Sequence, residues 1–301
     1  MPTILIGGGT GFIGSRLSDH LTQHGHTVRH LSRSARPDST YATFHWDAKT
    51  GDFDDAALDG VDYVINLAGA GIADKRWTAA RKQVIINSRT ETTGLLAAAL
   101  ARTGVKPRAY LSASAVGYYG DRPGEVLTED DRPGTGFLSK SCILWEESVA
   151  EIERLGVPTF LARTGIVLHP AGGALEKMVL PMLARVSTYF GDGSQVYSWI
   201  HLDDMVDVYR FAIEKGLTGP YNAVAPQPAT NRALAEAIPR AMDKKALVLP
   251  APAFALKLAL GEMSHTVLDS AHCSAQKLLD AGFTFRHPEL GGALRHLFTE
   301  G

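Results

Sequence analysis

Short apolar stretches alternate with amphipathic stretches along the first half of the chain. The apolar stretches predict strands at 3–6, 27–31, 43–46, 61–67, 108–112 and 157–168. Between them, apolar residues spaced three or four positions apart predict a helix that begins near Ile13, a second over 78–102 and a third over 137–155. Strands that alternate with helices indicate a parallel sheet with helices on both faces, so the pattern predicts a doubly wound α/β fold.

The second half of the chain has shorter elements, which are separated by glycine and proline residues. Gly172-Gly173 and the turn at Gly191-Asp192-Gly193 are examples. We expect residues 1–165 to form the sheet domain and residues 166–301 to form a smaller substrate-side domain with a C-terminal extension. The second part is expected to interleave with the last strands of the sheet, and a ligand is expected in the cleft between the parts.

Residues 7–14 read Gly-Gly-Gly-Thr-Gly-Phe-Ile-Gly and lie between the first predicted strand and the first predicted helix. Glycines at such a turn let a pyrophosphate approach the backbone, and the N–H groups at the helix start face the anion. The spacing Gly8-x-x-Gly11-x-x-Gly14 resembles the extended short-chain dehydrogenase/reductase superfamily, which includes nucleotide-sugar epimerases, and a Rossmann-type fold is implied. The residues expected to hold the cofactor phosphates are Gly8, Thr10, Gly11, Phe12, Ile13 and Gly14.

The end of the second strand indicates which nicotinamide cofactor binds. NAD-binding proteins of this type place a carboxylate there, about 20 residues past the glycines, to accept a hydrogen bond from the ribose 2′-hydroxyl. This chain has Ser32-Arg33 instead, and Arg36 follows. Because a guanidinium binds phosphate through two parallel hydrogen bonds, Ser32 and Arg33 favour the 2′-phosphate of NADP.

Two further segments resemble cofactor-lining parts of the superfamily. Leu67, Ala68 and Gly69 follow Asn66 after the fourth strand and match the superfamily's Asn-x-Ala-Gly segment. Small residues at the carboxyl end of a strand leave room for a ligand. Arg89 lies on the next helix, where superfamily members place polar residues near the cofactor, and a surface position fits it equally well.

The segment after the fifth strand resembles the superfamily's catalytic region. It reads Ser112-Ala113-Ser114-Ala115-Val116-Gly117-Tyr118. Ser114 matches the serine or threonine that hydrogen-bonds the reacting oxygen, Tyr118 is a second catalytic candidate, and Ser112 is expected to lie against the cofactor. The superfamily's Tyr-x-x-x-Lys is absent, because Leu138 and Cys142 occupy the positions of the tyrosine and the lysine.

A second departure concerns the substrate. Epimerases of nucleotide sugars commonly carry an arginine just before an apolar-His-x-x-Asp run, where it binds substrate phosphates. Here Tyr197 stands in that position, and the run itself contains His201 and Asp204. This departure weakens the case for a nucleoside-diphosphate sugar, and the substrate stays open. We expect His201 and Asp204 to be structural, as a buried histidine bonded to a helix-capping aspartate.

The whole set of motifs resembles atypical extended reductases that are called epimerase-family, or SulA-like cell-division inhibitor, proteins with a C-terminal extension. The resemblance implies an NADP-dependent oxidoreductase or epimerase of unknown substrate. The alternative is a non-catalytic protein that responds to NADP(H) and binds a protein partner linked to cell division. The motifs that carry the resemblance are 7–14, 66–69, 114–120, 163–168, 172–175, 198–201 and 281–283.

Composition narrows the classes of function. Thirty Lys and Arg against 32 Asp and Glu give a formal net charge of −2, so a nucleic-acid partner is not expected. No apolar stretch reaches the roughly 20 residues that a spanning helix needs, and we expect a cytoplasmic protein with no membrane contact. The two cysteines are expected to be ordinary buried residues. No metal site is expected, because His20 and His24, although four residues apart, have no third ligand nearby in sequence and suit a solvated helix face.

Overall fold

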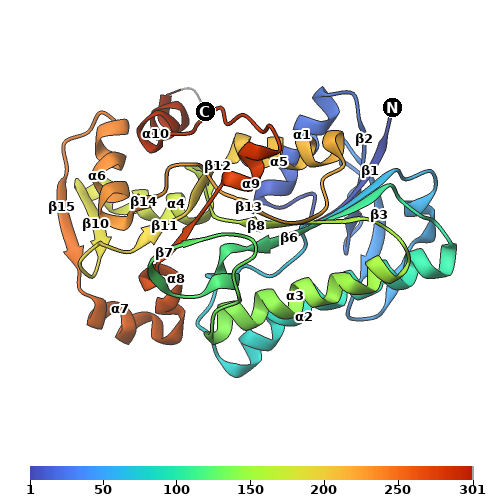
Figure 1. Cartoon of the computed structure of the whole chain (residues 1–301), viewed down its shortest axis with the longest axis horizontal. Coiled ribbons are helices and arrows are strands. Elements are labelled where there is room, and N and C mark those ends of the chain that lie inside the picture. Colours follow the sequence, from blue (N-terminus) through green and yellow to red (C-terminus); the bar gives the residue numbers. More distant parts are fainter. Residues whose placement is uncertain (300–301) are drawn as a thin grey trace.

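An eight-stranded sheet forms the centre of the molecule, which we describe from a computed structural model over residues 1–299. Seven strands are parallel, and only β4 at one edge runs antiparallel to its neighbour (Figure 1). This is a Rossmann-type doubly wound α/β fold, as the sequence predicts. Across the sheet the strands are β13 (Gly219–Ala223), β8 (Thr159–Thr164), β6 (Ala109–Ala115), β5 (Tyr63–Asn66), β1 (Thr3–Gly7), β2 (Thr27–Ser32), β3 (Ala42–Asp47) and β4 (Asp52–Phe53).

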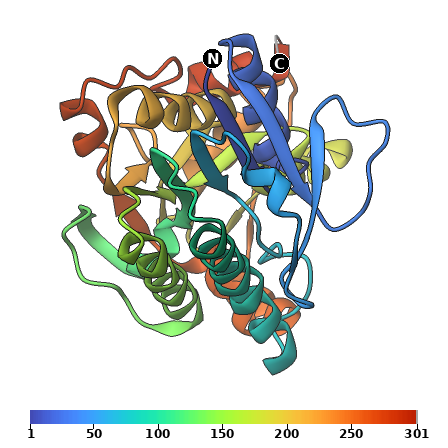
Figure 2. The same cartoon turned by 90° about the vertical axis from the view of Figure 1, so that its right-hand side faces the viewer.

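Helices cover both faces of this sheet. The helices α1 (Phe12–Gln23) and α5 (Leu202–Lys215) pack together on one face, and α2 (Ala79–Thr103) and α3 (Gly136–Arg154) pack together on the other (Figures 1 and 2). The central strand β1 is therefore buried from both sides, and Ile4, Leu5 and Ile6 have no exposed surface. The apolar strands required this cover, because a parallel sheet has two hydrophobic faces.

The second half of the chain forms small sheets and helices beside strand β13 of the main sheet and helix α5 (Figure 1). Two-stranded parallel sheets are formed by β10 (Val186–Phe190) with β15 (Leu247–Ala251) and by β9 (Ile166–His169) with β12 (Trp199–His201). A four-stranded sheet has the order β14 (Ala229–Thr230), β11 (Val196–Tyr197), β16 (Ala271–Cys273) and β7 (Arg122–Leu127). The helices of this part are α4 (Gly173–Val179), α6 (Asn231–Ala241), α7 (Ala253–Leu260), α8 (His265–Leu268), α9 (Gln276–Asp280) and α10 (Leu290–Thr299), and the short 3₁₀ turns of the chain are η1 (Asp55–Leu58), η2 (Val116–Tyr119), η3 (Leu180–Ala184) and η4 (Gly261–Ser264).

The single strand predicted over 157–168 is wrong, because the chain changes sheets at Gly165. β8 ends there after pairing with β13, and β9 then pairs with β12. The backbone N–H of Gly165 donates to Ala223, whereas the next N–H donates to Ser198. A Cβ atom on Gly165 would lie 2.3 Å from the carbonyl oxygen of Ser198, so only glycine fits this crossing. At Gly165 the chain leaves the main sheet. The domain boundary expected after residue 165 stays a prediction.

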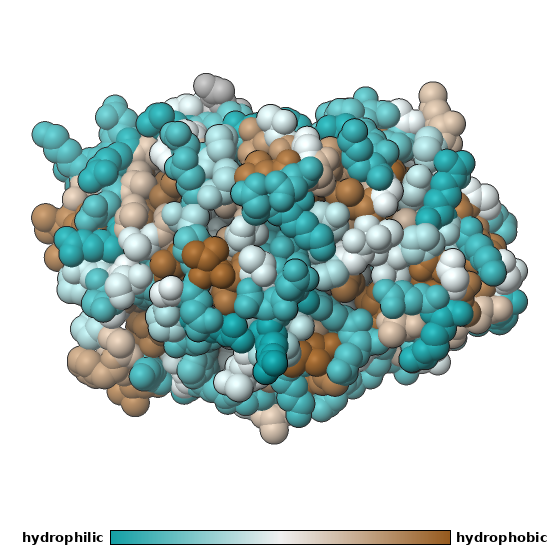
Figure 3. All heavy atoms as spheres, in the orientation of Figure 1, coloured by the Kyte–Doolittle hydropathy of each residue, from teal (hydrophilic) through white to brown (hydrophobic). Residues whose placement is uncertain are grey.

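The helix α7 exposes apolar side chains. Phe254 is 75% exposed and Leu258 is 81% exposed. Apolar side chains are visible at the lower left of Figure 3, where α7 lies in Figure 1. This helix has only eight residues, and within residues 1–299 no helix is both long and apolar enough to cross a membrane.

Candidate functional site: the glycine turn and the end of strand β6

The glycine turn brings two predicted cofactor segments into contact. Gly8 has a φ of +81°, and a Cβ atom there would lie 2.9 Å from both the backbone nitrogen of Ala68 and the carbonyl carbon of Leu67. A Cβ atom on Gly14 would lie 2.2 Å from the carbonyl oxygen of Gly8. Glycine at these positions therefore lets β1, the turn and the segment after β5 pack without side chains between them.

Gly11 is the N-cap of α1 and is exposed, as is Thr10. Phe12 and Ile13 form the first turn of α1 and are half-buried. The first turn of a helix leaves backbone N–H groups without helical partners, and these favour an anion. The exposed backbone at the start of α1 therefore fits the pyrophosphate of a dinucleotide.

Asn66 fixes the backbone of the segment that follows β5 and packs against this turn. Asn66 is fully buried, and its side-chain oxygen accepts a hydrogen bond from the N–H of Ala68 at 3.1 Å. Its amide nitrogen donates to the hydroxyl of Tyr110 at 3.1 Å. Leu67 and Ala68 are half-buried and Gly69 is exposed. The buried asparagine thus fixes the backbone of the segment that packs against the glycine turn.

The end of β2 lies beside an open hollow of about 700 Å³. Ser32 Oγ donates to the carbonyl oxygen of Ser34 at 2.9 Å and forms a local turn. Arg33 is exposed and forms no hydrogen bond or ion pair within residues 1–299. Arg36 lines the hollow together with Gly9 and Thr10, so its guanidinium borders this space.

The predicted catalytic serine lies at the end of a buried charge network. Ser114 Oγ donates to Oε1 of Glu146 on α3 at 2.6 Å. Arg163 on β8 binds the same carboxylate through two hydrogen bonds, from Nε and Nη2, each 2.9 Å long. The side chain of Arg163 is 4% exposed and that of Glu146 is 12% exposed. Burial opposes the charge of Arg163, but the hydrogen bonds and charge of Glu146 hold the pKa of this guanidinium above its usual value.

Two neighbouring tyrosines have different environments. The ring of Tyr118 lies under the guanidinium of Arg163, 3.6 Å from ring centre to Cζ, and its hydroxyl makes no hydrogen bond within the described residues. Tyr119 is fully buried, accepts a hydrogen bond from Arg163 at 2.9 Å and donates to Asn222 at 2.7 Å. The hydroxyl of Tyr118 therefore has no partner among residues 1–299, whereas that of Tyr119 is part of the interior network.

Leu138 and Cys142, which occupy the positions of the superfamily's tyrosine and lysine, lie on helix α3 and face this region. A Cβ atom on Gly117 would lie 3.4 Å from Cβ of Leu138 and 3.7 Å from Sγ of Cys142, so both residues face η2. Burial, followed by the charge of Glu146, raises the pKa of the Cys142 thiol to about 12. Neither residue therefore supplies a proton or a charge near neutral pH. Ser112 on β6 is fully buried, and its hydroxyl donates to the carbonyl oxygen of Ala113.

Arg89 on α2 reaches the same place from the other side. Its guanidinium lies 4.8 Å from the ring centre of Trp145, and its Nη1 donates to the carbonyl oxygen of Ala70 at 3.1 Å. A Cβ atom on Gly69 would lie 3.2 Å from Cζ of Arg89. Its charge also interacts with the Cys142 thiol, and burial lowers its pKa from the usual arginine value. The surface position considered for Arg89 is therefore wrong, because its guanidinium packs between the 67–70 segment and α3.

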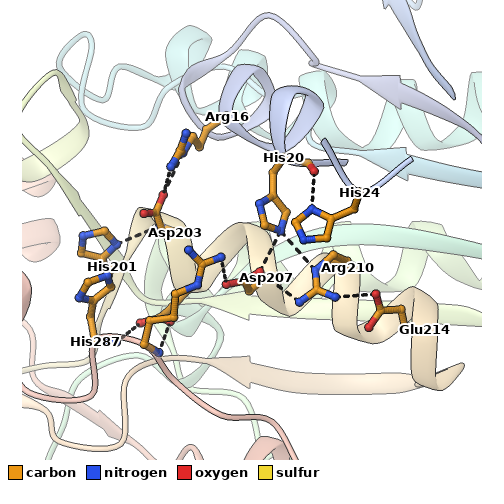
Figure 4. A network of polar contacts seen from close by, with 11 residues as sticks. Arg16, His20, His24, His201, Asp203, Asp207, Arg210, Glu214 and His287 are labelled. Atoms are coloured by element: carbon orange, nitrogen blue, oxygen red, sulfur yellow. Dashed lines mark hydrogen bonds and ion pairs between the residues drawn. The ribbon is translucent and has the colours of Figure 1, made fainter. Parts of the chain in front are cut away.

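The structure confirms only part of what the sequence predicts for His201, Asp204 and His20. His201 is buried, as expected, but it is itself the N-cap of α5, because its Nδ1 accepts a hydrogen bond from the N–H of Asp203. Asp204 instead accepts from backbone N–H groups near residue 286. The solvated face expected for His20 is wrong, because His20 is buried and pairs with Asp207 on α5 at 2.8 Å (Figure 4).

Glu146 and Arg163 are the functional candidates that motif reading missed. The available signal was a charge inside a buried strand, because Arg163 lies within the apolar run 157–168. A buried guanidinium requires a carboxylate partner, and α3 carries several. The sequence alone did not show which carboxylate faces β8.

The sequence matches the NAD dependent epimerase/dehydratase family over residues 4–224 and a domain of unknown function, DUF1731, over residues 251–297. It is 39% identical to an epimerase family protein of Mycobacterium bovis over 98% of this chain and 97% of that protein. It is 36% identical to the epimerase family protein YfhF of Bacillus subtilis, over 99% and 98% of the two chains.

Among solved structures, the fold resembles that of the human epimerase family protein SDR39U1, which was determined with NADPH. The TM-score is 0.88, the identity is 30%, and 99% of each chain is covered. None of these names mentions cell division, so the SulA-like part of the resemblance gains no support. The glycine turn, the sheet order and the match over 4–224 agree, and the chain belongs to the NAD dependent epimerase/dehydratase family.

Proposed function

We propose that the protein binds NADP(H) and acts as an oxidoreductase or epimerase on a substrate that is not a nucleoside-diphosphate sugar. The cofactor proposal rests on the end of β2, where the chain has Ser32-Arg33 and no carboxylate. The glycine turn nearby, whose Gly8 packs against Leu67 and Ala68, would hold the phosphates of the same cofactor. Arg36 lines the hollow beside the end of β2, and the exposed side chain of Arg33 directly follows that strand, so both would be available to bind a 2′-phosphate. The human relative determined with NADPH supports the same choice.

The bound nicotinamide would supply the hydride chemistry, and the protein would orient the substrate and handle a proton. Ser114 already donates its hydroxyl hydrogen to Glu146, so its oxygen remains an acceptor for a substrate hydroxyl. Tyr118 has a hydroxyl with no protein partner in the described part of the chain, and it can donate to a substrate carbonyl. The two side chains thus offer opposite hydrogen-bonding roles at one end of β6.

Arg89 would replace the missing lysine. In the superfamily the lysine ammonium lies one helical turn beyond the tyrosine and binds the nicotinamide ribose. Here the equivalent position is Cys142, and Arg89 brings a guanidinium to its side from α2. Contacts with Trp145 and the carbonyl oxygen of Ala70 hold that guanidinium next to Gly69. An arginine does not lose its charge in proteins, so it can bind the ribose but not transfer a proton.

The substrate proposal rests on Tyr197. This residue stands where nucleotide-sugar epimerases commonly carry a phosphate-binding arginine. Tyr197 is buried, and its hydroxyl donates to the carbonyl oxygen of Val267 at 2.6 Å. It therefore presents neither a charge nor a free hydroxyl to a diphosphate, which supports a smaller or uncharged carbonyl substrate.

Turnover assays test the proposal. The purified protein is mixed with NADPH and a panel of carbonyl compounds and nucleotide sugars, and NADPH oxidation and epimer formation are followed. We expect NADPH-dependent reduction of at least one carbonyl compound and little reaction of the sugars. Rapid epimerisation of a nucleotide sugar would contradict the proposal. Tight NADPH binding without any turnover would favour the non-catalytic alternative instead.

An Arg89→Leu variant tests the replacement of the lysine. We expect it to weaken NADPH binding while Arg89→Lys retains most of it, since both wild-type and lysine variants present a cation. Arg154, which is exposed at the end of α3, provides the matched control Arg154→Leu. Unchanged NADPH binding in Arg89→Leu would remove Arg89 from the site.

A further inference from the structure

Four potential metal ligands converge at the junction between α5 and the C-terminal segment. They are His201, Asp203, His287 and His296, and one ligand atom from each lies within 4.8 Å of all the others. His201 and Asp203 begin α5, His287 lies in the segment before α10, and His296 lies on α10. Up to 95 residues separate them in sequence, so no spacing motif reveals the group.

We propose that these four residues form a binding site for a divalent transition metal ion, with zinc as the best match. Imidazole nitrogens and one carboxylate oxygen are typical zinc ligands, and four of them complete a tetrahedral site. His201 Nε2 and His296 Nδ1 are 3.1 Å apart. Zinc–nitrogen bonds of about 2.0–2.1 Å place two nitrogens of a tetrahedral site roughly 3.3 Å apart. The observed separation therefore needs only a small adjustment.

The three imidazole rings are already packed together. The ring of His287 stacks on that of His201 with 3.9 Å between the centres, and it lies 4.4 Å from the ring of His296. The Nδ1 of His201 accepts the N–H of Asp203, so its Nε2 carries the proton that lies between it and His296. For Nε2 to bind a metal ion, this proton must move to Nδ1, so the ring gives up its contact with the N–H of Asp203 when the bond to the metal forms.

Neighbouring contacts hold the ligands in place. The carboxylate of Asp204 accepts the backbone N–H groups of Arg286 and His287 at 2.7 and 3.0 Å, which fixes the segment that carries His287 against α5. Asp203 is held through Oδ1 by Arg16 of α1 at 2.7 Å (Figure 4). Such outer contacts orient metal ligands before the ion binds.

The burial of the four ligands also suits a metal ion that enters from solvent. His201 and Asp203 are buried, whereas His287 and His296 are half-buried, so the cluster has an inner side and an outer side. An ion bound there would link α5 to residues 287–296 of the C-terminal extension. It would act as a structural clasp, separate from the cofactor segments at the glycine turn and β6.

Zinc titration of the whole protein tests this site. After treatment with a chelator and dialysis, the protein is titrated with ZnCl₂ in a calorimeter, and its thermal unfolding is followed with and without zinc. We expect one equivalent of zinc to bind and the melting temperature to rise. His296→Ala should lower the zinc affinity at least tenfold and remove most of that rise.

Two further variants keep the test decisive. His265→Ala changes an exposed histidine that pairs with Asp269 outside the cluster, so zinc binding should stay unchanged. His287→Ala serves if His296→Ala does not fold, and it should also lower the affinity. Failure of the wild-type protein to bind zinc, or equal binding by the wild type and both folded cluster variants, would overturn the proposal.

Discussion

Glu146 and Arg163 form a two-point ion pair directly behind Ser114, with both nitrogen–oxygen distances at 2.9 Å. The pair joins α3 to β8 beneath the end of β6. Because Glu146 also accepts the hydroxyl of Ser114, the orientation of the candidate catalytic serine depends on a buried ion pair. An interaction within the protein interior thus sets the geometry of the proposed site.

Breaking this pair should destabilise the protein strongly. Glu146→Gln leaves the buried charge of Arg163 without its carboxylate, and removal of one partner from a buried pair typically costs about 3–5 kcal/mol. We expect a loss of about 3 kcal/mol in the free energy of unfolding, measured by denaturant titration. The exposed neighbour provides the control Glu147→Gln, with an expected change under about 0.5 kcal/mol. Equal stability of the two variants would contradict this role.

Removal of either candidate hydroxyl should slow any reaction that the protein catalyses. A positioned acid or base contributes a factor of roughly 100 to 10,000 in rate, and we expect Tyr118→Phe and Ser114→Ala to lose activity in that range. The control is Tyr189→Phe, which removes a hydroxyl from β10 outside the site. An active enzyme unaffected by both site variants would exclude these two residues from the chemistry.

Both cysteines should be inert in the folded protein. Burial raises the pKa of the Cys142 thiol to about 12 and that of the Cys273 thiol to about 12. Thiolates are the reactive form, and a raised pKa keeps both groups protonated at pH 8. We expect no alkylation by iodoacetamide in native conditions and two labels after unfolding, as read by mass spectrometry. Rapid labelling of Cys142 in the native protein would indicate an accessible, reactive thiol instead.

Gly11→Val should separate folding from cofactor binding. Gly11 has a φ of −79°, so a side chain brings no backbone strain, and a Cβ atom would have only the carbonyl oxygen of Gly8 nearby, at 3.2 Å. The valine would instead occupy the exposed space where the pyrophosphate is expected. We expect a folded variant with at least tenfold weaker NADPH binding in a fluorescence titration. The control is Gly94→Val in the middle of α2, where the nearest neighbour of a Cβ atom would be Oε2 of Glu151 at 4.0 Å, and it should bind normally. Normal binding by Gly11→Val would place the phosphates elsewhere.

The sequence predicted most strands of the main sheet because their signals are local. The run Ile4-Leu5-Ile6 followed by a glycine turn predicts a buried strand that leads into a helix, and the structure confirms it. The break at Gly165 was missed because its cause is distant: the carbonyl of Ser198 approaches too closely for any side chain. Apolar residues on both sides of that glycine read as one strand.

The candidate site was predictable only where a motif carries it. Ser114 and the 67–69 segment were found by resemblance, whereas the partnership of Arg163 with Glu146 depends on how α3 packs on β8. Arg89 is similar, because only the packed structure shows its guanidinium next to Cys142. The histidine cluster joins the start of α5 to the distant C-terminal segment that carries His287 and His296, and no pattern along the chain predicts such a meeting.

Cofactor preference tests the proposed binding of NADP(H) most directly. We predict that calorimetric titration will show tighter binding of NADPH than of NADH. Arg33→Ala should lower the affinity for NADPH by roughly 10- to 100-fold, because a hydrogen bond to a charged group contributes about 1.5–3 kcal/mol. The same variant should bind NADH as the wild type does, and Arg36→Ala, at the hollow beside β2, should act in the same direction. Equal affinities for the two cofactors, or a preference that survives both substitutions, would contradict the assignment of NADP(H).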